Sequence, residues 1–221
     1  MPPQASDCAS PSARKRLKPD ERRSQILDVA VAFFAEVGLD GRTRDLSERA
    51  GITQSLLYNY FGSKEALIEA VFERVYLDRL QPEWRVLLTD RAIPLSERMQ
   101  RFYEAYTRVI FTYEWMRIFM FAGLAGAKLN LRYLAHLRTS FLEPMLAEIS
   151  ASAAPDLRAP DMEDIWALHG AIVYIGIRRY VYQVPTPEDD APHIARAIAG
   201  FLRGFGIATA GEAASPCQAV T

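Results

Sequence analysis

Cysteine and histidine are scarce in this chain of 221 residues. Its two cysteines, Cys8 and Cys217, lie near opposite ends. Its three histidines fall on different predicted elements, at His136, His169 and His193. Such a set offers neither a disulfide framework nor the spacing of metal ligands. We therefore expect no structural disulfide, no metal site and no cofactor.

A long hydrophobic run is also missing. The longest apolar stretch, Ala171–Ile177, ends at two arginines and is far shorter than the about 20 residues that span a bilayer. The N-terminal segment has no apolar core of the kind found in secretory signal peptides. These absences predict a cytoplasmic protein that is not embedded in a membrane.

An excess of charge of one sign is absent as well, because the formal net charge is −1. The chain as a whole is therefore not a polycation that binds nucleic acid by charge alone. Basic residues nevertheless gather between Arg14 and Arg23. We expect residues 1–18 to be a disordered basic arm that can approach a DNA backbone, and residues 210–221 to be a disordered tail.

Catalytic patterns are the last notable absence. The histidines do not form a His-Glu-x-x-His motif, and neither a nucleophile elbow nor a glycine-rich phosphate loop occurs. We therefore predict that the chain is not an enzyme. A helical-bundle carrier or enzyme that acts on an apolar ligand, with no role at DNA, stays open as the alternative.

What the chain does contain is helical periodicity, with no alternating pattern typical of a strand. The predicted fold class is all-α, with nine helices in two domains that cover residues 19–64 and 65–209. Residues that favour the N-cap position mark helix starts, and Pro82 is expected to kink or end the fourth helix. The helices are predicted at residues 20–38, 43–50, 53–61, 63–82, 95–112, 113–125, 129–152, 161–184 and 186–208, with N-caps at Asp20, Thr43, Thr53, Ser63, Asp161 and Thr186.

The stretch from Arg42 to Lys64, RTRDLSERAGITQSLLYNYFGSK, has the spacing of a helix-turn-helix. Apolar residues four apart face inward from each of its two short helices, and a glycine permits the turn between them. The other side of the second helix is polar, and a recognition helix presents such a side to base edges in the major groove. Its outward residues are Gln54, Ser55, Tyr58 and Asn59.

These residues resemble the tetracycline-repressor-like (TetR-like) family of bacterial transcription regulators. The resemblance is strongest from Ser24 to Val71, in ILDVAVAFFAEVGLDG followed by TRDLSERAGITQSLLYNYFGSKEALIEAVF. It implies a homodimer with a helix-turn-helix at each N-terminus and a helical C-terminal domain that binds a small effector. It further implies a repressor that the effector releases from an approximately palindromic, double-stranded DNA operator.

The motif and the resemblance together nominate residues for contact with DNA. Gln54 carries an amide group that can pair with N6 and N7 of adenine, whereas Tyr58 and Lys64 are better suited to phosphates. A solvated helix face, or aromatic packing for the tyrosines, is the alternative. The predicted DNA-binding residues are Thr43, Arg44, Thr53, Gln54, Ser55, Tyr58, Asn59, Tyr60 and Lys64.

Aromatic residues are concentrated beyond the motif, between Phe102 and Tyr174. Most of them must form the core, but a few could line an apolar pocket between helices. Such a pocket predicts a small apolar or aromatic effector, and leaves either a carboxylate or a hydroxyl open as its polar group. The residues predicted to bind it are Tyr106, Met120, Trp166, His169 and Tyr174.

The last two predicted helices each carry an apolar face. Small residues one turn apart, such as Gly200 and Gly204, permit close contact between helices. We expect these helices to form a four-helix dimer interface, although ordinary packing within one chain explains the same pattern. The predicted interface residues are Ile165, Ile172, Gly176, Ile194, Ile198, Phe201 and Phe205.

Overall fold

The computed structural model describes residues 18–76, 79–126 and 128–209, and every regular element within them is helical. The all-α prediction is therefore confirmed. Apart from Lys18, the predicted arm and tail lie outside the described residues. The helices are α1 (Pro19–Val37), α2 (Thr43–Arg49), α3 (Gln54–Phe61), α4 (Lys64–Tyr76), α5 (Glu83–Thr89), α6 (Leu95–Ile110), α7 (Tyr113–Leu124), α8 (Lys128–Leu137), α9 (Glu143–Ser152), α10 (Met162–Gly176) and α11 (Ala191–Arg203).

The predicted count of nine is too low for the described residues, because the short helix α5 was not expected and the single helix predicted over residues 129–152 comprises both α8 and α9. Its N-cap is Pro82, a residue that tolerates the first turn of a helix but was interpreted only as a helix breaker. Trp84 and Leu88 lie four residues apart on α5 and are both buried. Burial of these two side chains stabilises a helix that is too short to show a clear periodicity in the sequence.

Two of the long helices contain a π-helical turn. Helix α8 runs into α9 through the turn Arg138–Leu142, and α10 is extended by the turn Ile177–Val181. Pro144 follows the first turn and has no backbone N–H to donate, so a wider turn accommodates it without ending the helix. The predicted continuous helix over residues 129–152 therefore forms despite its proline.

Three of the six predicted N-caps are confirmed. Thr53 accepts a hydrogen bond from the backbone N–H of Leu56, and Ser63 accepts one from Ala66. Asp161 forms a reciprocal capping box with Asp164 at the start of α10.

The other three N-cap predictions are wrong by one or more residues. Helix α1 begins at Pro19, before Asp20, and α2 has Arg42 rather than Thr43 at its N-cap. Helix α11 begins at Ala191 instead of following Thr186. Arg179 explains this shift, since its guanidinium donates to Thr186 Oγ1 at 2.8 Å and to both carboxylate oxygens of Asp190 at 2.7 and 2.8 Å. The segment before α11 is thereby held as a loop.

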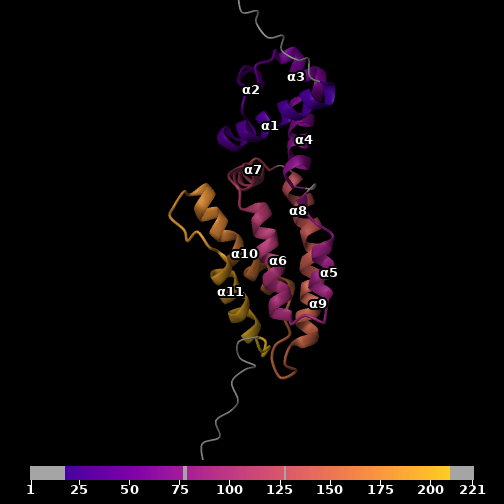
Figure 1. The fold of residues 1–221 in the computed structure, drawn as a ribbon, viewed down its shortest axis with the longest axis vertical. Helices are drawn as coiled ribbons and strands as arrows, with labels where there is room; N and C mark the ends of the chain where they lie inside the picture. The colour runs from indigo at the N-terminus through magenta and orange to yellow at the C-terminus, as the bar shows by residue number, and fades with distance from the viewer. Residues whose placement is uncertain (1–17, 77–78, 127, 210–221) are drawn as a thin grey trace, which may run out of the picture.

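Helices α1–α3 lie together at one end of the molecule, and α4 leads from them into a bundle of the remaining helices (Figure 1). Helix α4 packs against α1 and α3 on one side and against α7 and α8 on the other. Helix α7 lies across the junction and packs along α1. The two ends of the molecule are therefore joined by α4 and by the α1–α7 contact. Among the described helices, none has the length and apolarity needed to cross a membrane.

Candidate nucleic-acid interface and ligand cavity

The helix-turn-helix is held by a small apolar core. Leu46 of α2 and Leu57 of α3 are almost completely buried. Gly51 has φ of 63°, a left-handed conformation that suits glycine and lets the chain turn sharply between the two helices. The backbone N–H of Ile52 then donates to the carbonyl of Ser47 at 3.0 Å. The inner faces of both helices are thus closed, and the polar side of α3 is left outward.

The outward side of α3 carries the predicted base-reading residues. Gln54, Ser55 and Asn59 are exposed, and Tyr58 is 36% exposed. Gln54 Nε2 donates to Thr43 Oγ1 at 2.8 Å, and Thr43 Oγ1 lies 3.0 Å from the hydroxyl of Tyr58. One threonine of α2 therefore orients two residues of the recognition face.

This geometry adds a positioning role to the DNA contact predicted for Thr43. Its side chain is only 8% exposed, and its hydroxyl is already engaged by Gln54 and Tyr58. The residue therefore positions the side chains of Gln54 and Tyr58, and its contact with DNA stays a prediction.

The remaining predicted DNA contacts lie around the same face. Arg44 is exposed and forms an ion pair with Glu48 at 3.4 Å. Thr53 caps α3, and Lys64 is the half-buried first residue of α4. Tyr60 is half-buried and packs against the core, so its ring has a structural role whatever its hydroxyl contacts.

A cavity of about 340 Å³ lies in the bundle between α6, α7, α8 and α10. Four of the five residues predicted to bind an effector line it, although they come from three different helices. The lining residues are Tyr106, Trp115, Met116, Phe119, Met120, Tyr133, Leu134, Trp166, His169, Gly170, Val173 and Ile177.

Tyr174 is the predicted effector residue that the structure does not place at the cavity. It is 49% exposed and does not line the cavity, and its ring contacts Tyr182. Trp115, Phe119 and Tyr133 were missed. Trp115 and Phe119 lie one helical turn apart on α7, a spacing that could have indicated a shared wall.

The cavity has polar atoms but no charge. The hydroxyl groups of Tyr106 and Tyr133 lie 2.7 Å apart in a hydrogen bond. Burial raises the pKa of both phenols, so they stay protonated. Burial also lowers the pKa of His169 to about 4, so its imidazole is neutral near pH 7.

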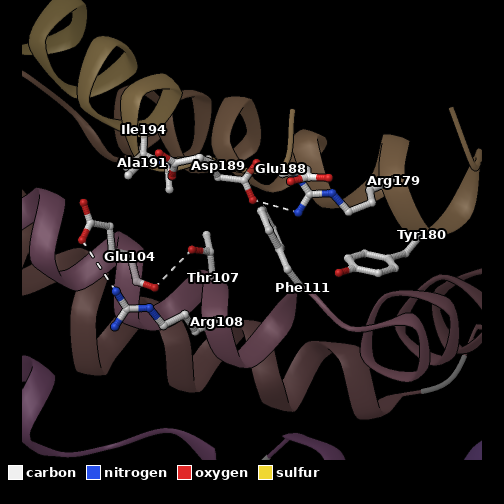
Figure 2. A pocket seen from close by; sticks show the side chains of 11 residues that line it. Glu104, Thr107, Arg108, Phe111, Arg179, Tyr180, Glu188, Asp189, Ala191 and Ile194 are labelled. Carbon is white, nitrogen blue, oxygen red and sulfur yellow. Dashed lines mark hydrogen bonds and ion pairs between the residues drawn. The ribbon is translucent and has the colours of Figure 1, made fainter. Parts of the chain in front are cut away.

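A second, polar pocket lies between α6 and the loop that precedes α11 (Figure 2). Arg179 occupies one side of it, where it is paired with Asp190 and lies 5.8 Å from the centre of the Phe111 ring. Glu104 and Arg108 form the α6 side. Because Arg179 is already fully engaged by the loop, we interpret this pocket as part of the loop's structural support.

The predicted dimer residues are almost all buried inside the bundle of one chain, and their role in a dimer stays a prediction. Ile165, Ile172, Ile194, Ile198 and Phe205 are all buried within one chain, as is Gly176. Phe201 is half-buried and packs against Phe205. The apolar faces of α10 and α11 pack against each other, and α11 also packs against α6.

Gly176 has a packing reason of its own. A Cβ atom there would lie 2.6 Å from side-chain atoms of Met116 and Phe111. The glycine therefore allows α10 to approach the neighbouring helix closely, and any larger residue would displace it.

Comparison with known proteins agrees with this architecture. A family model described as bacterial regulatory proteins of the tetR family matches residues 26–71. The HTH-type transcriptional repressor KstR2 of Mycobacterium tuberculosis is 39% identical over 87 residues, which are 39% of this chain and 42% of that protein. The HTH-type transcriptional repressor NicS of Pseudomonas putida is 33% identical over 92 residues, with coverages of 40% and 43%. The chain thus matches less than half the length of these curated relatives.

The fold likeness covers more of the chain. A crystal structure of a TetR-like transcriptional regulator from Rhodococcus sp. RHA1 has a TM-score of 0.63 at 21% sequence identity, and the match covers 85% of this chain and 97% of that one. The helix-turn-helix and the helical bundle together form an all-helical fold like that of this regulator. Within it, residues 26–71 are similar to the bacterial regulatory proteins of the tetR family.

Proposed function

We propose that this chain is a dimeric, sequence-specific DNA-binding repressor that a small apolar effector releases from a palindromic operator. The observation that carries the proposal is the outward polar face of α3, with Gln54, Ser55 and Asn59 exposed on a helix whose inner side is closed by Leu57. Such a face has no part in the core of the chain. It matches what a recognition helix needs in the major groove.

Dimerisation is proposed through the outer faces of α10 and α11 in place of the buried faces. On α10, Ala167, Ala171 and Tyr174 are exposed. On α11, Gly200 is exposed and Ala199 is half-buried. Small side chains on these faces let two helices approach a second copy closely. A two-fold dimer built this way presents two recognition helices to a palindromic site.

The proposed switch runs from the cavity to α4. Tyr76 of α4 donates its hydroxyl hydrogen to the backbone carbonyl of Trp115 at 2.9 Å. Its ring centre lies 5.0 Å from that of Trp115 and 5.7 Å from that of Tyr133. Both residues are part of the cavity wall. An effector that displaces this wall therefore moves α4, whose first turn adjoins the recognition helix.

A second connection reaches α1. Arg117 of α7 donates Nε–H to the carbonyl of Ala35 at 2.7 Å and a terminal N–H to the carbonyl of Glu36 at 3.3 Å. These carbonyls lie in the last turn of α1, which has no basic residue of its own. Movement of α7 is therefore transmitted to α1. A coupling of about 1–3 kcal/mol between the two sites would suffice, corresponding to about 5- to 150-fold in DNA affinity.

The test begins with selection of binding sites from random duplex DNA by the full chain. We expect a palindromic consensus, because two copies related by a two-fold axis read two half-sites. Lys64→Ala should weaken binding to the selected site and to mismatched sites to a similar extent. It should also reduce the slope of the logarithm of affinity against the logarithm of salt concentration by about one unit for each lysine removed, as loss of a phosphate contact does.

The matched control is Arg85→Ala, which removes an exposed cation from α5, far from α3 along the chain. It should leave affinity and salt dependence unchanged. Failure of the folded wild-type chain to enrich any sequence at low salt, with or without a metabolite extract, would favour the carrier function.

A further inference from the structure

The walls of the bundle cavity fit ring systems. Trp115 and Phe119 are stacked with ring centres 5.1 Å apart, and the rings of Tyr133 and Trp166 add further walls. Aromatic side chains at this density offer both apolar area and ring contacts to a ligand. A volume of about 340 Å³ suits a compact ligand with few fused rings.

The lining provides no partner for a charged ligand. It contains no lysine, arginine, aspartate or glutamate among the residues that the structure describes. A carboxylate or ammonium group would lose its hydration there without gaining a counter-ion, which is costly in an apolar site. Of the two polar groups that the sequence left open, the carboxylate is therefore disfavoured.

His169 is a polar side chain of the cavity wall without a hydrogen-bond partner. It is only 7% exposed, and neither of its ring nitrogens has a hydrogen-bond partner among the described residues; Nδ1 is the more deeply enclosed of the two. The hydroxyl of Tyr106, the nearest aromatic ring on the cavity wall, is already bonded to Tyr133. A buried polar atom without a partner is unfavourable, so a ligand that supplies one gains affinity.

The chemistry of the imidazole restricts what that partner is. A neutral ring has one N–H donor and one bare nitrogen acceptor, and either nitrogen can carry the hydrogen. A hydroxyl group both donates and accepts, so it satisfies whichever nitrogen meets it. A carbonyl group accepts only, and a carboxylate brings a charge as well.

From these observations we propose that the cavity takes a neutral, ring-containing ligand with a hydroxyl group, and that His169 is the hydrogen-bond partner of that hydroxyl. The proposal rests on the proposed function in treating this cavity as the effector site. It adds the chemical class of the effector and the residue that selects it. His169 thereby discriminates between compounds that share a ring system.

Three probes with the same bicyclic skeleton test the proposal: naphthalene, 2-naphthol and 2-naphthoate. Binding of each to the full chain is measured by equilibrium dialysis at pH 7, without DNA. We expect 2-naphthol to bind about 2- to 10-fold more tightly than naphthalene, which is the gain from one net hydrogen bond. We expect 2-naphthoate to bind at least about 100-fold more weakly than 2-naphthol, since its charge is left unpaired.

Variants at His169 assign the selectivity. His169→Phe should abolish the preference for 2-naphthol over naphthalene while retaining naphthalene binding, and His169→Gln should restore part of it. His136→Phe is the matched control, because it makes the same replacement at an exposed histidine that does not line the cavity. It should leave all three affinities unchanged.

Results of two kinds would overturn the proposal. Equal or stronger binding of 2-naphthoate by the wild-type chain would do so, and this needs no variant to fold. Equal affinities for naphthalene and 2-naphthol, as expected if water satisfies His169, would do so as well.

Operator binding, measured separately, distinguishes this inference from the proposed function. A chain that binds its selected operator but none of the three probes refutes the ligand class alone. A chain that prefers 2-naphthol but selects no DNA supports the ligand class and refutes the repressor function.

Discussion

Acidification from pH 7 to pH 5 is expected to destabilise the fold through His169. The pKa of this residue is lowered by burial from 6.5 to about 4. Below pH 6.5 the unfolded chain binds a proton at this position that the folded chain excludes, so the free energy of unfolding falls as the pH falls. Between pH 7 and pH 5 this difference in proton binding raises the logarithm of the unfolding equilibrium constant by about 1.4, which corresponds to about 2 kcal/mol. The loss continues until about pH 4, where the folded chain also binds the proton.

Urea unfolding of the wild-type chain and of His169→Gln at pH 7 and pH 5 measures this loss. Glutamine does not titrate, so the variant should lose about 2 kcal/mol less than the wild type between the two pH values. Other titrating groups are common to both proteins and cancel in the difference. They include Glu148, whose pKa is lowered by hydrogen bonding to Arg91 and Arg98. If both proteins lose the same free energy, His169 is not a buried neutral histidine, and the reasoning about the cavity is refuted.

Two further predictions concern the proposed switch and the dimer. Arg117→Met keeps an apolar stem against Tyr113 and Phe121 but removes the bonds to the end of α1. It should reduce the effector-induced change in operator affinity, measured by fluorescence anisotropy, while operator binding without effector is retained; an unchanged effector response would exclude this route. Ala171→Arg should convert the dimer to a folded monomer in sedimentation experiments, because a long charged side chain blocks close contact of small-residue faces. Ala151→Arg on the exposed side of α9 should leave the dimer intact, and a dimeric Ala171→Arg protein would argue against the proposed face.

Helices with strong periodicity and side-chain caps could be predicted from sequence, and α3 is the clearest case. Its N-cap, its buried residues and its polar face all follow from local spacing. Helix α5 could not be predicted in the same way, because the burial of Trp84 and Leu88 depends on helices that come later in the chain. The start of α11 depends on Arg179, a residue in another element.

The candidate site residues also differ in whether local spacing was enough to predict their place in the structure. Residues on one face of one helix, such as Gln54 and Asn59, were placed correctly on the outside of α3. The apolar face of α11 was interpreted as a dimer interface, yet Ile194 and Ile198 pack within the chain. Periodicity shows that a face is apolar but does not identify the surface that covers it. Tyr174 was predicted to bind the effector but does not line the cavity, for a related reason. Aromatic character alone does not show which side of α10 faces the cavity.

The bonds from Arg117 to the end of α1 have a consequence for experiments that exchange the proposed DNA-binding part between related chains. Two of the carbonyl groups that close the first helix receive their donors from α7, about 80 residues away in sequence. In a chimera that replaces only the N-terminal segment, the last turn of a different first helix would face Arg117. Its carbonyl groups need not lie where Arg117 can donate to them. Chimeras should therefore exchange α1–α4 together with the face of α7 that contacts α1. The contact between α1 and α7 joins segments that are distant in sequence, so replacing the N-terminal segment alone does not preserve it.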